Sequence, residues 1–203
     1  MKTPKEITIE SYNKTADEYA TKVAHLYLEN EANTFLSYLA PGSKILDLGC
    51  GSGRDAKIFS EKEYKVIGID LSEKLLEIAA KNAPGAEFKL MDIINLHFPD
   101  NHFEGVWSNA SLLHISKSEI NQTINGIYRV LKKEGMLFVC TKEGTGEVLE
   151  LDKRYEGCKK FWSFFQKDEL ESYLKDFTVI ESYVSKSENK YIATNWINIF
   201  CIK

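Results

Sequence analysis

The chain has 203 residues, and its 26 Lys and Arg against 30 Asp and Glu give a formal net charge of −4. This length suits one domain, and a mildly acidic chain without a Lys/Arg-rich stripe is unlike proteins that follow a phosphate backbone. No run is apolar and long enough to span a membrane, and the N-terminal residues lack the apolar core of a signal peptide. We expect a soluble cytoplasmic protein with no membrane partner and, tRNA aside, no nucleic-acid partner.

Three regions follow one another in what we expect to be a single domain, residues 1–203. Residues 1–40 have a helical pattern rich in Tyr, Glu and Asn and are expected to form an N-terminal helical cap. Residues 43–142 alternate strand-like and helix-like segments, and residues 143–203 form a C-terminal part on the substrate side. Alternation of this kind predicts an α/β fold, a mostly parallel sheet with helices on both faces. Ligands of such sheets bind outside the carboxyl ends of the strands.

The most informative segment is KILDLGCGSGRD, residues 44–55. A short apolar run ends near Asp47, the glycines Gly49, Gly51 and Gly53 follow, and Arg54 opens a helical pattern. Strand, tight turn and helix then present a bare backbone against which a ligand can lie. A nicotinamide dinucleotide site is the nearest alternative, but its G-x-G-x-x-G fingerprint would require glycine where Arg54 stands.

Two further strand-like runs also end in an acid. KVIGID ends at Asp70, and AEFKLMDI carries Asp92 near its end. A carboxylate at the end of the second strand can accept hydrogen bonds from both hydroxyls of a ribose. Asp70 alone does not distinguish a nicotinamide dinucleotide site from a site for another ligand that contains a ribose. The feature that distinguishes them is the third acid, Asp92, at the end of the third strand.

Taken together, these motifs resemble those of the class I S-adenosylmethionine (SAM)-dependent methyltransferases, in the small-molecule branch of the superfamily. The resemblance extends from about Tyr12 to Lys203 and includes FPDNHFEGVWSNASLLHI, in which Glu104 replaces the usual Asp. It implies a Rossmann-like sheet of seven strands, with the last strand inserted antiparallel. It also implies SAM as the methyl donor and S-adenosylhomocysteine as the product.

The resemblance assigns a donor role to residues at each strand end. Asp47 would anchor the amino group, Asp70 the ribose hydroxyls and Asp92 the adenine amino group. Arg54 could pair with the donor's carboxylate or point to solvent, and Tyr19 lies in an N-terminal segment like the one that covers the donor in the family. The predicted donor-binding residues are Tyr19, Asp47, Gly49, Cys50, Gly51, Gly53, Arg54, Asp70, Leu71, Met91, Asp92, Ile93 and Asn109.

Candidate catalytic groups follow the fourth and fifth strands. His114 could act as a general base, because an imidazole titrates near neutral pH, or it could simply order the following helix. Lys142 and Glu143 start a charged, glycine-containing segment that could contact a polar substrate or be a solvated turn. The aromatic run at residues 161–165 could roof an acceptor pocket or pack a helix onto the sheet.

The cysteines Cys50, Cys140, Cys158 and Cys201 form no C-x-x-C pair and have no accompanying His cluster. We therefore expect reduced thiols and no metal site. Cys50, inside the glycine loop, is expected to pack as a small residue beneath the ligand.

The predicted activity is methyl transfer from SAM to an O, N, S or C atom of a small molecule, by a monomer or homodimer. The Asn-Pro-Pro-Tyr type of motif that holds amino groups of nucleic-acid bases is missing, since residues 109–112 read NASL. Three alternatives stay open: a tRNA or protein methyltransferase, a SAM-binding protein without turnover, and a nicotinamide-dependent oxidoreductase.

Overall fold

A computed structural model describes residues 1–187 and 194–203. Its helices are α1 (Pro4–Lys14), α2 (Ala16–Val23), α3 (Glu29–Ser37), α4 (Arg54–Glu61), α5 (Glu73–Asn82), the 3-10 turn η1 (Leu112–His114), α6 (Ile120–Val130) and α7 (Lys167–Tyr173). Its strands are β1 (Lys44–Leu48), β2 (Lys65–Asp70), β3 (Glu87–Leu90), β4 (Phe103–Asn109), β5 (Leu131–Lys142), β6 (Glu147–Leu151), β7 (Lys159–Ser163), β8 (Thr178–Ser187) and β9 (Thr194–Ile202).

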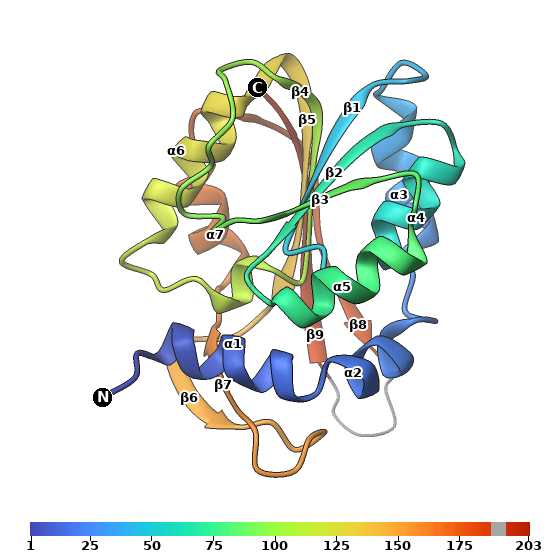
Figure 1. Cartoon of the computed structure of the whole chain (residues 1–203). Helices are drawn as coiled ribbons and strands as arrows, with labels where there is room; N and C mark the ends of the chain where they lie inside the picture. Colours follow the sequence, from blue (N-terminus) through green and yellow to red (C-terminus); the bar gives the residue numbers. More distant parts are fainter. Residues whose placement is uncertain (188–193) are drawn as a thin grey trace.

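Seven strands form one twisted sheet in the order β3-β2-β1-β4-β5-β9-β8 (Figure 1). The pairs among β1 to β5 are parallel, and β9 lies antiparallel between β5 and β8. The predicted fold class is therefore confirmed, including the antiparallel insertion of the last strand. Because β1 to β5 are parallel, their carboxyl ends meet at one edge of the sheet.

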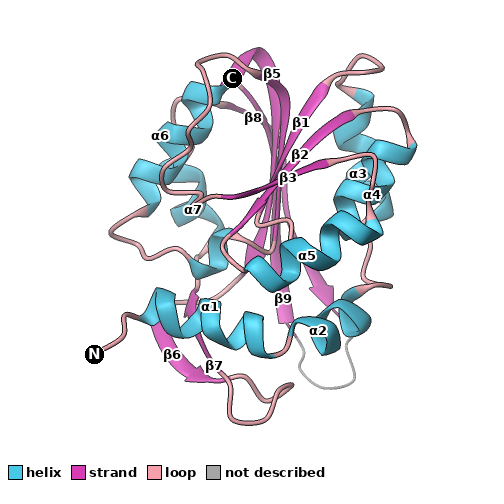
Figure 2. Cartoon of the chain, viewed as in Figure 1, coloured by secondary structure: helices cyan, strands magenta, loops and turns pink. Residues whose placement is uncertain are grey.

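Helices cover both faces of the sheet, as Figure 2 shows by colour. One face packs against α6 and α7, and the apolar stripe of α6 supplies Ile120, Ile124 and Ile127 to that core. The other face packs against α3 and α4, where Phe35, Phe59 and Trp107 meet edge to face or tilted. Because both faces of the sheet are covered, the inner strand β1 is buried along almost its whole length. No helix in the described ranges is long and apolar enough to cross a membrane.

The N-terminal helices α1 and α2 lie across the carboxyl end of the sheet, at the bottom of Figure 1. Thr3 caps α1 through a capping box with Glu6, and Pro4 occupies the first turn, where a missing amide costs nothing. The cap contacts α5 on one side and β7 on the other. It therefore closes over the edge where the parallel strands end.

A separate two-stranded sheet, β6 with β7, was not predicted from the sequence. The aromatic run lies partly in β7, where Phe161 pairs with Leu149 and Trp162 with Val148. In β7, Lys159 is exposed, Lys160 and Trp162 are buried, and Phe161 between them is partly exposed, as expected for a strand. The hairpin projects beside α1, so it covers the same end of the main sheet (Figure 1).

Candidate active site

A cleft lies where the parallel strands end, beneath α1. It encloses about 740 Å³, including the open solvent at its mouth. Its walls are α1, the loops that follow β1, β2 and β3, and the turn after β4. The predicted donor-site residues that line it are Tyr19, Gly49, Gly51, Asp70, Leu71, Met91, Asp92 and Ile93.

A smaller polar pocket of about 300 Å³ shares Tyr19 and Gly49 with the cleft. The other predicted residues that line this second pocket are Asp47, Cys50, Arg54 and Asn109. Two pockets that share two lining residues can hold the two parts of one elongated ligand. The structure thus brings together every predicted donor-site residue except Gly53.

The glycine loop passes close beneath the segment that follows β4. Gly49 has φ +65°, and a Cβ there would stand 2.6 Å from the Ser111 Cβ. Ala110 adopts a left-handed conformation with φ 58°, which is uncommon for a residue with a side chain. Its amide donates to the Cys140 carbonyl at 2.8 Å, which ties this turn to β5. The floor of the cleft is therefore a tight contact between two loops.

Gly53 has a packing role that the sequence did not suggest, and its predicted role in donor binding stays a prediction. It precedes α4 with φ +77°, and a Cβ there would lie 3.0 Å from the Cα of Ala79 on α5. It lines neither pocket. Its lack of a side chain lets α4 pack closely on α5, so its requirement for glycine is structural.

Asp47 is buried in the second pocket with only 3% of its surface exposed. Its Oδ2 atom has no hydrogen-bond partner among the described residues. Burial, followed by the nearby Asp55 charge, raises the pKa of the Asp47 carboxyl well above its usual value, and Arg54 opposes this shift. An unpaired buried carboxylate is costly, and a cationic group in the pocket would relieve that cost.

Asp55 is the hub of a buried hydrogen-bond network that sequence reasoning missed. Its carboxylate accepts two bonds from Arg54, at 2.7 and 2.9 Å, and one each from Trp107 and Asn109, both at 2.9 Å. Arg54 is therefore paired inside the protein, rather than pointing to solvent as one prediction had it. The acidic residue directly after the glycine loop was the available signal in the sequence.

Asp70 fixes the glycine loop to the end of β2. Its Oδ2 accepts from the Gly51 amide at 2.9 Å, and its Oδ1 accepts from the Ser72 amide at 2.8 Å. Burial raises the pKa of this carboxyl, although both amides stabilise its charged form. An ionised carboxylate has about four lone-pair positions, so each oxygen can still accept a ligand hydroxyl.

Asp92 is reached from the N-terminal cap. The Lys5 ammonium of α1 lies 2.9 Å from Asp92 Oδ2, and the Ile94 amide donates to Oδ1 at 3.0 Å. Lys5 also lies 3.6 Å from Glu119. This ion pair joins α1 to the far wall of the cleft, a contact that no local sequence pattern predicts.

His114 lies at the cleft, at the end of η1, and both ring nitrogens are engaged. Nδ1 lies 2.7 Å from the Phe161 carbonyl, which can only accept, so Nδ1 carries the proton. Nε2 then accepts from the Tyr12 hydroxyl at 2.9 Å. Burial is the largest cause that lowers the pKa of His114 to about 3. The bond to Phe161 opposes this shift, and the charges of Lys160, Lys142 and Arg154 add to it. The imidazole is neutral at pH 7.

Lys142 and Glu143, the other predicted catalytic residues, do not line the cleft. Lys142 places its Nζ 3.6 Å from the centroid of the Trp162 ring. Glu143 accepts from the Asn195 side chain at 2.9 Å, which joins the end of β5 to β9. In the parts of the chain that the structure describes, no group of three His, Cys, Asp or Glu side chains could hold a metal ion.

Residues 45–135 match the family model of a methyltransferase domain, and these residues carry the glycine loop and all three acids. The match covers less than half of the chain, and it makes these residues similar to a methyltransferase domain. The fold is similar to that of a SAM-dependent methyltransferase of Methanosarcina mazei, with a TM-score of 0.74 at 24% identity over 82% of this chain and 95% of that chain.

Individual relatives differ in what they methylate. Phosphoethanolamine N-methyltransferase 1 of Arabidopsis thaliana is 40% identical over 38% of this chain and 17% of its own length. Demethylmenaquinone methyltransferase of Symbiobacterium thermophilum is 34% identical over 51% of this chain and 44% of its own length. The chain therefore spans less than half the length of either relative.

A solved structure shares the fold over the whole chain. It is 1,6-didemethyltoxoflavin-N1-methyltransferase of Burkholderia thailandensis, with bound 1,6-didemethyltoxoflavin and S-adenosylhomocysteine. The TM-score is 0.78 at 18% identity, and the match covers 100% of this chain and 91% of that chain.

Proposed function

We propose that this protein transfers a methyl group from SAM to an O, N, S or C atom of a small-molecule acceptor. The observation that carries the proposal is the buried Oδ2 of Asp47, unpaired among the described residues, in a pocket beside the glycine loop that shares Tyr19 and Gly49 with an acid-lined cleft. A ligand with an ammonium at one end and a nucleoside at the other matches both parts.

The donor-site residues are proposed to act as follows. Asp47 would pair with the donor's ammonium, and Asp70 would accept from the ribose hydroxyls. Asp92, with the Ile93 amide, would meet the adenine edge, while Leu71 and Met91 would flank the ring. SAM, when bound, supplies a methyl group on a positively charged sulfur, which is already activated for displacement.

The chain's own task is then to align the acceptor and exclude water. Tyr19 stands over Gly51, because a Cβ on Gly51 would meet its ring at 3.5 Å. Tyr12 packs edge to face on Tyr19 at 5.2 Å and bonds to His114. These aromatic side chains separate the cleft from the β6–β7 hairpin and would form the wall next to the acceptor.

Binding calorimetry with SAM and S-adenosylhomocysteine tests the donor site. Transfer of labelled methyl from SAM into fractionated cell extract tests turnover. Label in low-mass products supports the proposal. Label in RNA or protein would show that the acceptor is a macromolecule and not a small molecule. Donor binding without label in any fraction would favour a SAM-binding protein without turnover. Location in the cytoplasm, assembly as a monomer or homodimer and the boundaries of the domain stay predictions.

A further inference from the structure

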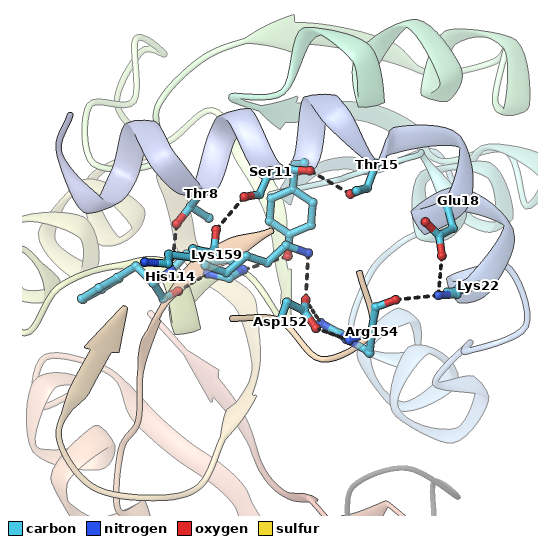
Figure 3. Close-up of polar contacts among 12 residues, drawn as sticks. Thr8, Ser11, Thr15, Glu18, Lys22, His114, Asp152, Arg154 and Lys159 are labelled. Carbon is cyan, nitrogen blue, oxygen red and sulfur yellow. Dashed lines mark hydrogen bonds and ion pairs between the residues drawn. The ribbon is translucent and has the colours of Figure 1, made fainter. Parts of the chain in front are cut away.

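Three cationic side chains gather behind Tyr12 and His114, on the side away from the donor pocket. They come from the end of β5, the β6–β7 connection and β7, and they are Lys142, Arg154 and Lys160. Figure 3 shows α1 above this region, with Asp152 and Arg154 beside the strand that carries Lys159. The donor-site function proposed above makes no use of this cluster.

Aromatic rings connect these cations to the cleft wall. Lys160 Nζ lies 3.8 Å from the centroid of Tyr12 and 4.5 Å from that of Tyr155. Trp162 lies 4.9 Å from His114, centroid to centroid, and carries Lys142 on its ring at 3.6 Å. Lys160 thus lies against a ring that lines the cleft, and Lys142 is separated by the Trp162 ring from His114, which also lines it.

Lys160 is fully buried, with no exposed surface. Its Nζ forms an ion pair with Asp152 Oδ2 at 3.1 Å. The Nζ atom has no hydrogen-bond partner with suitable geometry among the described residues. Asp152 is already bound by Arg154, whose guanidinium donates at 2.8 and 2.9 Å. An ammonium has three donors, so the charge of Lys160 is only partly compensated where it lies behind the Tyr12 ring.

Lys142 is the second cation whose positive charge is not fully neutralised by a neighbouring carboxylate. No carboxylate within residues 1–187 and 194–203 forms an ion pair with it at 4.0 Å or less. Glu150 on β6 influences its charge but is exposed, and Asp152 is shared with two other cations. Burial lowers the pKa of both Lys142 and Lys160 to about 8, so both still carry most of their charge at pH 7.

We propose that the methyl acceptor is an anion, and that Lys142 and Lys160 set this specificity by stabilising its charge beside Tyr12 and His114. The inference rests on the proposed methyltransferase function. A cation would be repelled by the cluster and by the positive sulfur of the donor, and a neutral acceptor would gain no charge–charge attraction from them, whereas an anion is attracted by both.

An anionic nucleophile also fits the state of His114. Its Nε2 lone pair is engaged by Tyr12, and the neighbouring cations oppose protonation. With an anion, the acceptor's own electron pair forms the new bond to the methyl carbon, and the carbon–sulfur pair stays on sulfur. No proton has to be removed, so His114 and Tyr12 act as positioning residues.

The test begins with methyl-labelled SAM and small metabolites separated by charge on ion exchangers. The acceptor is expected in the fraction retained by the anion exchanger. An acceptor found only in the unretained or cation-exchange fraction overturns the inference but leaves the methyltransferase function standing. No label in any fraction, with donor binding intact, overturns the proposed function, and the inference falls with it.

Variants then test the residues with the retained fraction as substrate. Lys142→Met and Lys160→Met are each expected to raise the apparent KM for that fraction about 10-fold or more, with little change in kcat. S-adenosylhomocysteine affinity should stay at the wild-type value, which also shows that each variant is folded. Lys142→Arg should restore KM, and Lys159→Met, an exposed neighbour on β7, should not change it. An unchanged KM in both methionine variants refutes the assignment.

Discussion

Replacing Asp47 by Asn is expected to weaken donor binding while stabilising the ligand-free protein. The carboxylate is 3% exposed, and its Oδ2 has no hydrogen-bond partner in the described part of the chain. A hydrogen bond between charged groups contributes about 1.5–3 kcal/mol, which corresponds to a loss of about 10- to 150-fold in affinity for the donor. Removing an unpaired buried charge recovers about 1–3 kcal/mol, and each kcal/mol raises Tm by about 2–4 °C in a chain of this size.

The assay compares two ligands that differ in the amino-acid part. S-adenosylhomocysteine carries the ammonium, and 5′-methylthioadenosine lacks it. Calorimetry should show that Asp47→Asn weakens the first and leaves the second unchanged. Asp168→Asn, on an exposed position of α7, is the matched control. Equal losses for both ligands, or no loss for either, would refute the ammonium assignment.

The pH dependence of stability gives a second test of the same carboxyl. Its pKa is raised in the folded protein, so the native state holds the proton more tightly than the unfolded chain. Stability of the ligand-free protein should therefore fall as pH rises from about 4, the unfolded value, through the raised native value. Asp47→Asn removes this loss, so its advantage over the wild type should grow across that window. A pH-independent difference would show that Asp47 is not buried in its charged form.

Three further predictions concern the other cleft residues. Asp70→Ala should weaken S-adenosylhomocysteine and 5′-methylthioadenosine alike, by about 10-fold or more, because both carry the ribose whose hydrogen bonds it would lose; calorimetry with a loss confined to one ligand would contradict this. Lys5→Met should raise the dissociation rate of S-adenosylhomocysteine in stopped flow by up to about fivefold, since the partly exposed pair with Asp92 is worth roughly 0.2–1 kcal/mol; an unchanged rate would argue against a closing role. His114→Asn should lower kcat by less than about 10-fold. Because the pKa of His114 is about 3, its titration should not change wild-type kcat between pH 5 and 8. A loss of about 10²–10⁴-fold in kcat would instead support the prediction that His114 is a general base.

The fold and the donor side of the site could be predicted because their determinants are local. Each acid lies at or near the carboxyl end of its own strand, and parallel strands bring their carboxyl ends together without further information. Asp47, Asp70 and Asp92 therefore lie at one edge of the sheet, as expected. Gly53 was assigned to the ligand because it belongs to the motif, although it is needed for the packing of α4 on α5.

The acceptor side could not be predicted because its contacts join distant segments. Tyr12 and His114 are 102 positions apart, and Lys5 and Asp92 are 87 positions apart. In the sequence, the strand that carries Lys160 looked like an aromatic run before a helix. The burial of the Lys160 ammonium could therefore not be predicted. Pairings of this kind depend on how α1 and the hairpin dock on the sheet, which no local pattern encodes.

The charges of the two halves of the site have opposite signs, and this arrangement limits which reaction the cleft favours. Asp47, Asp70 and Asp92 surround the proposed donor pocket, while Lys142 and Lys160 lie beyond Tyr12 and His114. A positively charged donor is stabilised on the acidic side and repelled by the basic side, so its orientation is fixed before the acceptor arrives. An anionic acceptor has the opposite preference. Transfer of the methyl group then removes the positive charge on sulfur and one negative charge on the acceptor, so the electrostatic attraction between the two halves of the site and the reacting groups decreases, while the ammonium of S-adenosylhomocysteine can still pair with Asp47.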